Sequence, residues 1–200
     1  MEKNCGKAYI IKADVTKETE VKNLFKEINK ITTTLDVVVN NSGIYIPEYI
    51  EEHSIETWDQ IMNTNLRGKL LCTKYSIPLL KNSSNPIIIN IATRAGISAM
   101  EESSAYCCAA TGIIMLTKVS ALELSKYSIR VNTISPGLTK TKLTLQYDTE
   151  EDFKEYVEKN PSKRIGTPED IANTVLFLIS KEGSFINGEN INVSGGILLK

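Results

Sequence analysis

Short apolar stretches alternate along the chain with longer stretches in which apolar residues recur every three or four positions. The short stretches are rich in Ile and Val, as is typical of strands that are buried on both faces of a sheet. The longer stretches have the period of helices with one buried face. This alternation predicts an α/β fold, in which helices cover both faces of a parallel sheet.

Five segments are predicted to be strands. Three of them have the continuous apolar character of central strands, and two are short segments near the ends of the chain. They cover residues 8–11, 36–40 in "LDVVVNNSG", 86–93 in "PIIINIAT", 129–135 in "IRVNTIS" before Pro136 and Gly137, and 189–196 in "ENINVSGG".

The first predicted helix follows Thr16, which we expect to be its N-terminal cap. Its apolar residues Val21, Leu24, Phe25 and Ile28 have the spacing of one helical face. Further helices are predicted over 54–80 (short, then long, with Pro78 near the end), 104–126, 150–159 on the surface, and 169–180 with Pro168 in the first turn.

The helix predicted over 104–126 is apolar or small-sided almost all the way round. Such a helix is covered on more than one side, either by a single thick core or by a further subunit. The residues concerned are Ala105, Cys108, Ala109, Gly112, Ile113, Met115, Leu116, Val119, Ala121 and Leu122.

Composition indicates a single globular domain over residues 1–200, with 42% hydrophobic and 24% charged residues. Lys and Arg total 23 against 24 Asp and Glu, so there is no basic surplus for binding nucleic acid. No uninterrupted apolar run approaches the ~18 residues of a membrane span, and no signal peptide is evident. We therefore expect a cytoplasmic protein with neither nucleic acid nor membrane as partner.

The cysteines and the single histidine do not suggest a metal site. Cys5, Cys72, Cys107 and Cys108 form no C-x-x-C pair, and His53 has no clustered partner. The cysteines are expected to be reduced and mostly buried, and His53 to lie on the surface.

Several motifs occur in one order along the whole chain, and on them the chain resembles the short-chain dehydrogenase/reductase family. The resemblance implies a Rossmann-type sheet, NAD or NADP as cofactor, a small carbonyl or alcohol substrate, and a homo-oligomer, either dimer or tetramer. The motifs are "ADVT", "NNSG", "IMNTNLRG", "IINIATRAG", "YCCAATG", "IRVNTISPG", "RIGTPEDIA" and "INGENINVSGG".

The resemblance also implies which residues contact the cofactor. Asp14 matches the acidic residue that meets the adenine amino group, although it is also placed to start the turn into the first helix. Pro136 and Gly137 match the segment beside the nicotinamide, with simple strand termination as the alternative. Gly43 lets the cofactor approach because it has no Cβ. The implied set is Asp14, Val15, Asn41, Gly43, Tyr106, Pro136, Gly137, Thr139 and Thr141.

Three residues correspond to the family's catalytic positions. Tyr106 matches the general acid or base, and Thr93, thirteen residues earlier, stands where the family has a serine that hydrogen-bonds the substrate carbonyl. Threonine keeps the hydroxyl and narrows the pocket by one methyl group. Asn65 matches an asparagine that bends its helix and holds a water in the proton relay.

Ala110 departs from the family pattern Y-x-x-x-K, in which a lysine follows the tyrosine by one helical turn. In the family this lysine binds the nicotinamide ribose and lowers the pKa of the tyrosine. Without it a tyrosine titrates near ~10, and a mistuned general acid or base loses roughly 10²–10⁴ in rate. Lys118 lies two turns further on and cannot replace it, so impaired activity is expected.

The resemblance begins at the family's third strand, because only thirteen residues precede Asp14 and none of them forms a T-G-x-x-x-G-x-G turn. We therefore expect an N-terminally truncated sheet and weak cofactor binding, since the helix that receives the pyrophosphate is missing. The strand at 36–40 would then be an exposed edge. Our hypothesis is that segment 8–11 pairs with it or that another chain covers it.

Two alternatives to an active oxidoreductase stay open at this point. One is a non-catalytic oligomerisation or binding module derived from the family, which accounts for Ala110 and for Ser194 where many relatives have aspartate. The other is a truncated gene product. The sequence names neither the substrate nor the choice between NAD and NADP.

Overall fold

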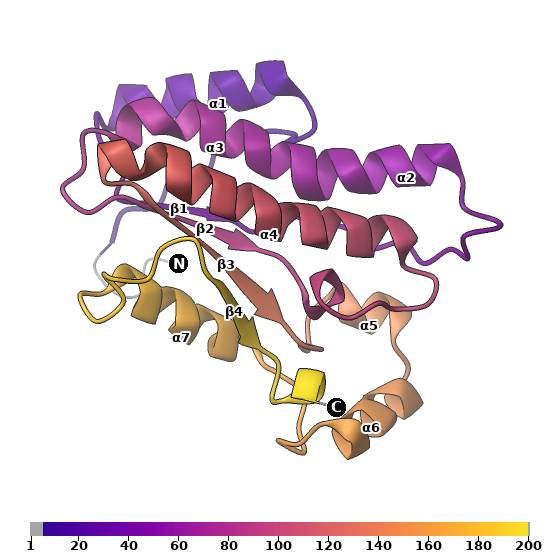
Figure 1. Ribbon diagram of the computed structural model, residues 1–200. Helices are drawn as coiled ribbons and strands as arrows, with labels where there is room; N and C mark the ends of the chain where they lie inside the picture. The colour runs from indigo at the N-terminus through magenta and orange to yellow at the C-terminus, as the bar shows by residue number, and fades with distance from the viewer. Residues whose placement is uncertain (1–5, 200) are drawn as a thin grey trace.

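The computed structural model describes residues 6–199 and contains, within that range, four parallel strands in the order β1-β2-β3-β4 (Figure 1). The α/β fold that the sequence predicts is therefore confirmed. Four of the five predicted strands are present, at β1 (Val37–Asn40), β2 (Ile87–Ile91), β3 (Arg130–Pro136) and β4 (Asn190–Val193).

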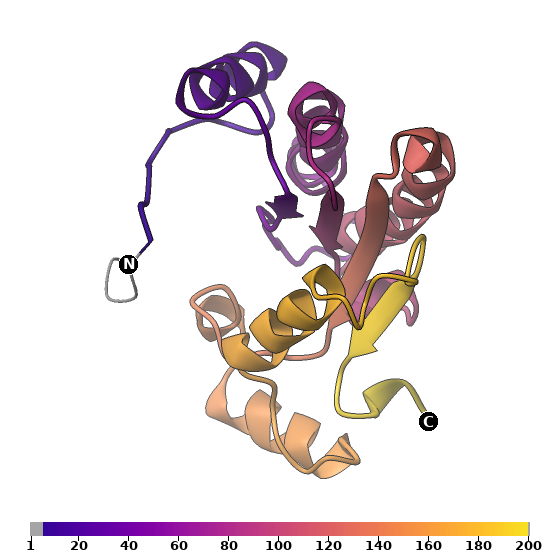
Figure 2. The same ribbon diagram turned by 90° about the vertical axis from the view of Figure 1, so that its left-hand side faces the viewer.

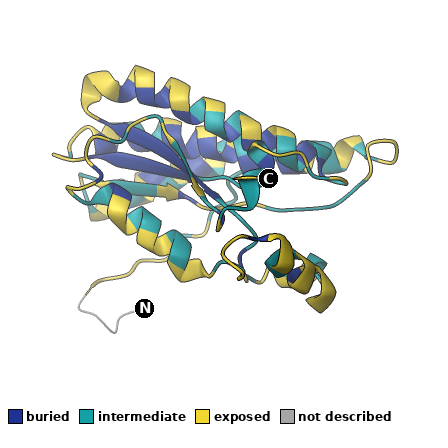
Figure 3. Ribbon diagram, turned by 60° about the horizontal axis from the view of Figure 1, so that its bottom comes forward, coloured by how far each residue is buried: buried dark blue, intermediate teal, exposed yellow. Residues whose placement is uncertain are grey.

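Helices lie on both faces of this sheet: α3 and α4 cover one face and α7 covers the other, while α1 packs against α3 (Figure 2). The predicted surface helix, α6, is exposed along most of its length (Figure 3). The helices are α1 (Glu18–Ile31), α2 (Ile55–Ile61), a π-helical turn (Met62–Arg67), α3 (Gly68–Leu80), α4 (Ser104–Leu124), α5 (Thr144–Tyr147), α6 (Glu150–Lys159) and α7 (Pro168–Ile179), with 3₁₀ turns at Arg94–Gly96, Ser125–Tyr127 and Ile197–Leu199.

The core sits on the two faces of β2 and β3. Ile88 faces α3 and α4, where it packs in one cluster with Leu80 and Val131. Its neighbours Ile87 and Ile89 point the other way and pack in a second cluster that includes Leu178 of α7. Successive residues of a strand face opposite sides, so a continuous apolar run is what a doubly covered sheet requires.

A buried polar network joins three strands to α4 directly below the carboxyl ends of the strands. The Nδ2 atom of Asn40 donates to Oδ1 of Asn90 at 2.8 Å, and Nδ2 of Asn90 donates to Oγ1 of Thr117 at 2.9 Å. Thr133 on β3 donates its hydroxyl to the same Thr117 oxygen at 2.7 Å. Because each buried group has a partner, the network holds α4 in a fixed position over the sheet.

The prediction of a strand at residues 8–11 is wrong. Residues 6–14 form no strand, and the Tyr9 and Ile10 residues are 62% and 99% exposed. The chain at Thr16 is instead tied to the helical layer, where Nη1 of Arg67 donates to the Thr16 carbonyl at 2.7 Å. Within residues 6–199, β1 therefore pairs with β2 alone, and Val39 is 43% exposed. A partner chain on this edge stays a hypothesis.

The start of α1 differs from the prediction by one residue. Lys17, not Thr16, occupies the N-cap, and its side chain makes no capping hydrogen bond. The hydroxyl and N–H of Thr16 both donate to Oδ1 of Asp14, at 2.7 and 2.9 Å. Asp14 and Thr16 thus form a turn just before the helix.

One helical stretch is long and apolar enough, by length and composition only, to cross a membrane, although it contains no uninterrupted apolar run of that length. Ser104–Tyr127 is a 24-residue helical stretch that passes that test, with a mean hydropathy of 1.5 over its best window. Its small polar residues interrupt the apolar run without lowering the average much. The inner side of this stretch packs on β3, as in the core helix of a globular fold.

His53 and the cysteines differ in part from expectation. The imidazole of His53 is only 7% exposed, because it lies edge-on to Trp58 with Nδ1 3.1 Å from a carboxylate oxygen of Glu48. Among the described cysteines, all free thiols, Cys72 is buried, Cys107 half-buried and Cys108 exposed. Cys5 lies outside the described residues.

Candidate active site

Two adjoining cavities open at the carboxyl ends of the strands, where ligands bind in open α/β sheets. The first cavity has a volume of about 480 Å³ and is lined by the loops after β1, β2 and β3 together with α3 and α4. The second cavity, of about 420 Å³, lies toward α5 and α6. Five residues line both cavities: Thr93, Tyr106, Gly137, Leu143 and Thr144.

Tyr106 lies in the first turn of α4, so its phenol is held by the helix that the polar network fixes to the sheet. Burial raises the pKa of Tyr106, and the hydroxyl of Thr93 opposes that rise only in part. The ring packs edge-on against Tyr45, with centroids 4.9 Å apart. Tyr106 is therefore a protonated group at neutral pH, able to donate a proton.

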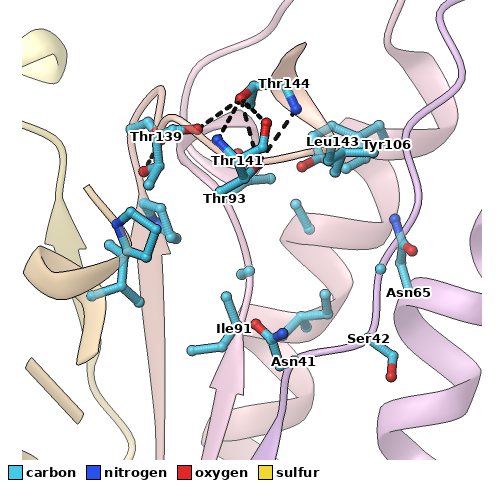
Figure 4. Close-up of a pocket in the computed structure, with 18 of the residues that line it drawn as sticks. Asn41, Ser42, Asn65, Ile91, Thr93, Tyr106, Thr139, Thr141, Leu143 and Thr144 are labelled. Carbon is cyan, nitrogen blue, oxygen red and sulfur yellow. Dashed lines mark hydrogen bonds between the residues drawn. The ribbon is translucent and has the colours of Figure 1, made fainter. Parts of the chain in front are cut away.

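Thr93 follows β2 and starts the 3₁₀ turn that leads away from the sheet. Its Oγ1 accepts from the N–H of Ala95 at 3.4 Å, which leaves the hydroxyl hydrogen available to a ligand. Thr93 and Tyr106 come from separate elements and each lines both cavities. Figure 4 shows the two side chains in the first cavity.

Asn65 is buried in the π-helical turn between α2 and α3. Its Oδ1 accepts from the N–H of Ile44, and its Nδ2 donates to the carbonyl of Ile44, each at 2.8 Å. The extra residue of a π-turn pushes a side chain out of the regular helical register. Here it lets Asn65 clamp the loop that follows β1 beside the first cavity.

The segment after β3 is packed too closely for any residue but glycine at position 137. A Cβ on Gly137 would lie 2.5 Å from the hydroxyl of Tyr156 and 2.9 Å from the Cα of Ser194. The Tyr156 hydroxyl also accepts from the N–H of Leu138 at 3.1 Å. Pro136 and Gly137 thus end the strand and also form part of the cavity wall.

Three threonines extend this wall, and Figure 4 shows them at one end of the first cavity with Asn41 and Ser42 at the other. The Thr144 hydroxyl donates to the carbonyl of Thr139 at 2.8 Å and accepts from the N–H of Thr141 at 2.9 Å. Sequence reasoning missed Thr144 and the short helix α5, since four residues leave no periodic signal.

Gly43 faces the first cavity without crowding. A Cβ there would meet Oδ1 of Asn65 at 3.5 Å, an ordinary contact, so packing alone does not require glycine at this position. The space left by the missing side chain is open to a ligand in the cavity.

Asp14 and Val15 are the two predicted site residues that line neither cavity. Hydrogen bonds from Thr16 lower the pKa of Asp14, which stays charged in its turn. Val15 packs toward α3, where its Cγ2 would lie 2.9 Å from a Cβ on Gly68. The turn-forming alternative for Asp14 accounts for the contacts observed.

Lys69 is a cavity residue that sequence reasoning missed. Only 4% of it is exposed, and its Nζ donates to the Ser42 carbonyl at 2.8 Å. Burial lowers the pKa of Lys69 to about 8. Ala110, 2% exposed, lines the same cavity. The available signal was a lysine one helical turn after Asn65, on the face of α3 that turns inward.

Comparison with known proteins agrees with this geometry. The family model described as enoyl-(acyl carrier protein) reductase matches residues 1–198. NAD-dependent glycerol dehydrogenase of Listeria innocua is 32% identical over 200 residues, covering 98% of this chain and 78% of the relative. The chain belongs to the short-chain dehydrogenase/reductase family.

Other relatives in the short-chain dehydrogenase/reductase family carry different names. The 3-oxoacyl-(acyl-carrier-protein) reductase FabG of Staphylococcus epidermidis is 34% identical over 193 residues, covering 96% of this chain and 78% of the relative. Meso-2,3-butanediol dehydrogenase of Serratia marcescens is 31% identical over 191 residues, covering 96% and 75%. Members of the family are NAD(P)-dependent oxidoreductases, as the motifs indicated.

The residues of the first cavity fit the nicotinamide half of such a cofactor. The cavity has the size of a small-molecule site. It offers open space at Gly43, hydroxyls at Thr139 and Thr141, and one buried ammonium at Lys69.

Proposed function

We propose that this chain is an NAD(P)-dependent oxidoreductase acting on a small carbonyl or alcohol. The first cavity takes the nicotinamide end of the cofactor, and the second cavity takes the substrate. The observation that supports this most is the position of Thr93 and Tyr106, which line both cavities at once. A group at that junction touches a substrate in one cavity while the cofactor faces it from the other.

Tyr106 and Thr93 both interact with the substrate oxygen, each in a different role. When bound, the nicotinamide supplies the hydride to a carbonyl carbon or accepts one from an alcohol. The Thr93 hydroxyl donates a hydrogen bond to the carbonyl oxygen, and Tyr106 donates the proton that this oxygen needs. The raised pKa of Tyr106 keeps that proton in place at neutral pH, which favours reduction over oxidation. Glycerol and meso-2,3-butanediol, named for two relatives, belong in the first substrate panel.

Expressed by itself, a polypeptide of residues 1–200 is expected to bind NADH roughly 100-fold less tightly than a site with a phosphate-binding helix N-terminus, because no glycine-rich turn within these residues presents such a helix end to the pyrophosphate. The sequence contains no T-G-x-x-x-G-x-G motif. The measurement is a titration of NADH fluorescence, with reduced nicotinamide mononucleotide as the matched ligand that lacks the adenosine half.

The two ligands should bind with similar dissociation constants, since the adenosine half adds little. A low-micromolar constant for NADH would contradict weak binding. No saturable response to either ligand would contradict the cofactor function and favour a non-catalytic binding module derived from the family.

The outer face of α4 supports the proposal of a homo-oligomer. Met115, Val119 and Leu122 are 58%, 44% and 77% exposed, and Leu70 on the neighbouring α3 is 47% exposed. Exposed apolar side chains on two helices of the same face are the kind of surface that a second copy of the chain buries.

We expect the wild-type chain to run as a dimer or larger species in size-exclusion chromatography with light scattering, and Leu122→Glu to shift it toward monomer. A charge placed in an apolar interface is desolvated without a partner. Ile50→Glu, at an 82% exposed loop residue, is the matched control and should leave the mass unchanged. A monomeric wild type would refute the proposal.

The free thiols support a cytoplasmic location, which we also propose. Cys72, Cys107 and Cys108 form no disulfide, although Cys107 and Cys108 are half-buried and exposed. Reducing compartments keep such thiols free.

A further inference from the structure

Lys69 is a buried cation with almost no protein partners. Its ammonium carries three N–H donors, and the one hydrogen bond it makes within residues 6–199 is to the Ser42 carbonyl at 2.8 Å. None of the described carboxylates lies within 4.0 Å of Nζ, since Lys69 takes part in none of the ion pairs. A buried ammonium with unused donors is costly to keep unless something else binds it.

The space beside Lys69 that a ligand can enter is the first cavity. Lys69 lines it beside Ser42 and Asn65 from α3, while Ala110 lines it from α4. Besides Lys69, the charged or titratable residues of the lining are Tyr106 and the exposed Lys142, so the wall contains no anion. The cavity thus has a buried positive charge without a carboxylate partner, which suits a ligand rich in hydroxyl or phosphate oxygens.

We propose that Lys69 binds the oxygens of the nicotinamide nucleotide in the first cavity. The inference rests on the proposed cofactor function and adds to it the residue that supplies the cation from α3. Because Ala110 leaves the α4 side of the same cavity without a long side chain, the ammonium of Lys69 is the only buried cation among the described lining residues. The oxygens are those of the ribose hydroxyls or of the adjoining phosphate.

A purely structural role for Lys69 is the competing explanation, since its hydrogen bond also holds the loop after β1. Lys69→Gln and Lys69→Met separate the two roles. Glutamine keeps a donor for the Ser42 carbonyl and removes the charge, whereas methionine removes both at similar length. Lys74→Met, on the same helix but at an exposed position, is the matched control.

The first measurement is NMR of the lysine side chains, with the Lys69 signal assigned by its loss in Lys69→Met. In the free protein this signal should titrate near the pKa of about 8. Reduced nicotinamide mononucleotide should shift the signal and raise that pKa, because the ligand's oxygens accept from the charged form. Reduced nicotinamide riboside, which lacks the phosphate, tells the two kinds of oxygen apart.

The second measurement is the NADH dissociation constant as a function of pH. Lys69→Met and Lys69→Gln should both weaken binding roughly 10- to 100-fold at neutral pH, as expected for a lost charge-assisted contact. Between about pH 7 and about pH 9 the wild type should lose affinity as Lys69 gives up its proton, and both variants should show no such loss. Cys72 and Tyr106 have raised pKa values and titrate above this window.

The double variant Lys69→Met with Ala110→Lys tests whether a cation on the α4 side of the first cavity can replace the ammonium of Lys69. A lysine at position 110 should restore much of the affinity that Lys69→Met loses, because it returns a cation to the same space. Lys74→Met should bind NADH as the wild type does.

The outcomes separate the two proposals. If the nucleotide shifts other cavity signals while Lys69 and its pKa stay unchanged, the assignment of Lys69 is overturned and the cofactor site stands. Retained affinity and pH dependence in Lys69→Gln overturn it in the same way. If no signal of the protein responds to any nicotinamide ligand, the proposed cofactor function is wrong, and so is the proposed role of Lys69.

Discussion

Replacing Tyr106 by phenylalanine is expected to lower kcat for NADH-dependent carbonyl reduction by about 10²- to 10⁴-fold, the usual contribution of a positioned general acid. Phenylalanine keeps the ring that packs against Tyr45 and removes only the hydroxyl. The site should therefore keep its shape and its affinity for NADH while it loses the proton donor. Because turnover is expected to be slow, NADH consumption and alcohol product are both measured in stopped assays after long incubation.

Tyr49→Phe is the matched control for this variant, because Tyr49 is 51% exposed and lines neither cavity. It should change kcat little. The raised pKa of Tyr106 adds a second readout: alcohol oxidation needs the phenolate, so its rate should climb with pH toward that pKa. Equal kcat in wild type and Tyr106→Phe, or oxidation whose rise with pH survives in the variant, would remove Tyr106 from the mechanism.

Replacing Asn65 by leucine is expected to lower the free energy of unfolding by about 3 kcal/mol, because two hydrogen bonds are lost and both backbone groups of Ile44 are left without partners in a largely buried place. Asn65 is 5% exposed, and its amide serves only the N–H and carbonyl of Ile44 among the described hydrogen bonds. Leucine has nearly the same size, so a cavity does not explain the loss. Urea unfolding followed by circular dichroism measures it.

Asn63→Leu makes the same change two residues earlier in the π-helical turn, at a half-buried side chain that makes no hydrogen bond among the described residues. It should cost much less. The released loop after β1 should also weaken NADH binding in Asn65→Leu and not in Asn63→Leu. Equal stability losses in the two variants would show that the clamp on Ile44 contributes nothing specific.

The site was predictable where family motifs mark it. Asn65, Thr93, Tyr106 and Gly137 were named from short strings, and all of them line the first cavity. Their roles in catalysis stay predictions until the variants are measured. Asp14 was named in the same way, but it closes a turn before α1 and lines neither cavity.

Lys69 shows why part of the site could not be read from the sequence. A lysine in an apolar helix ordinarily lies at the surface with its ammonium in water. Whether position 69 faces the sheet or solvent depends on how α3 is rotated against β1, and the π-helical turn just before it alters that rotation. The apolar pattern of α3 does not carry that information, and only the spacing of Lys69 from Asn65 points to it.

The sequence by itself determined the family, the α/β class and most of the elements. Strands that are covered on both faces, and helices that bury one face, each need a local pattern of apolar residues that the sequence shows directly. Only the tertiary structure decided that residues 8–11 form no strand, that Asp14 accepts hydrogen bonds from Thr16 and that Lys69 is buried. It also decided that the two cavities share Thr93 and Tyr106. Each of these depends on contacts between residues far apart in the chain. A four-residue apolar segment becomes a strand only if a neighbouring edge receives it, and here the chain is held in the helical layer by Arg67.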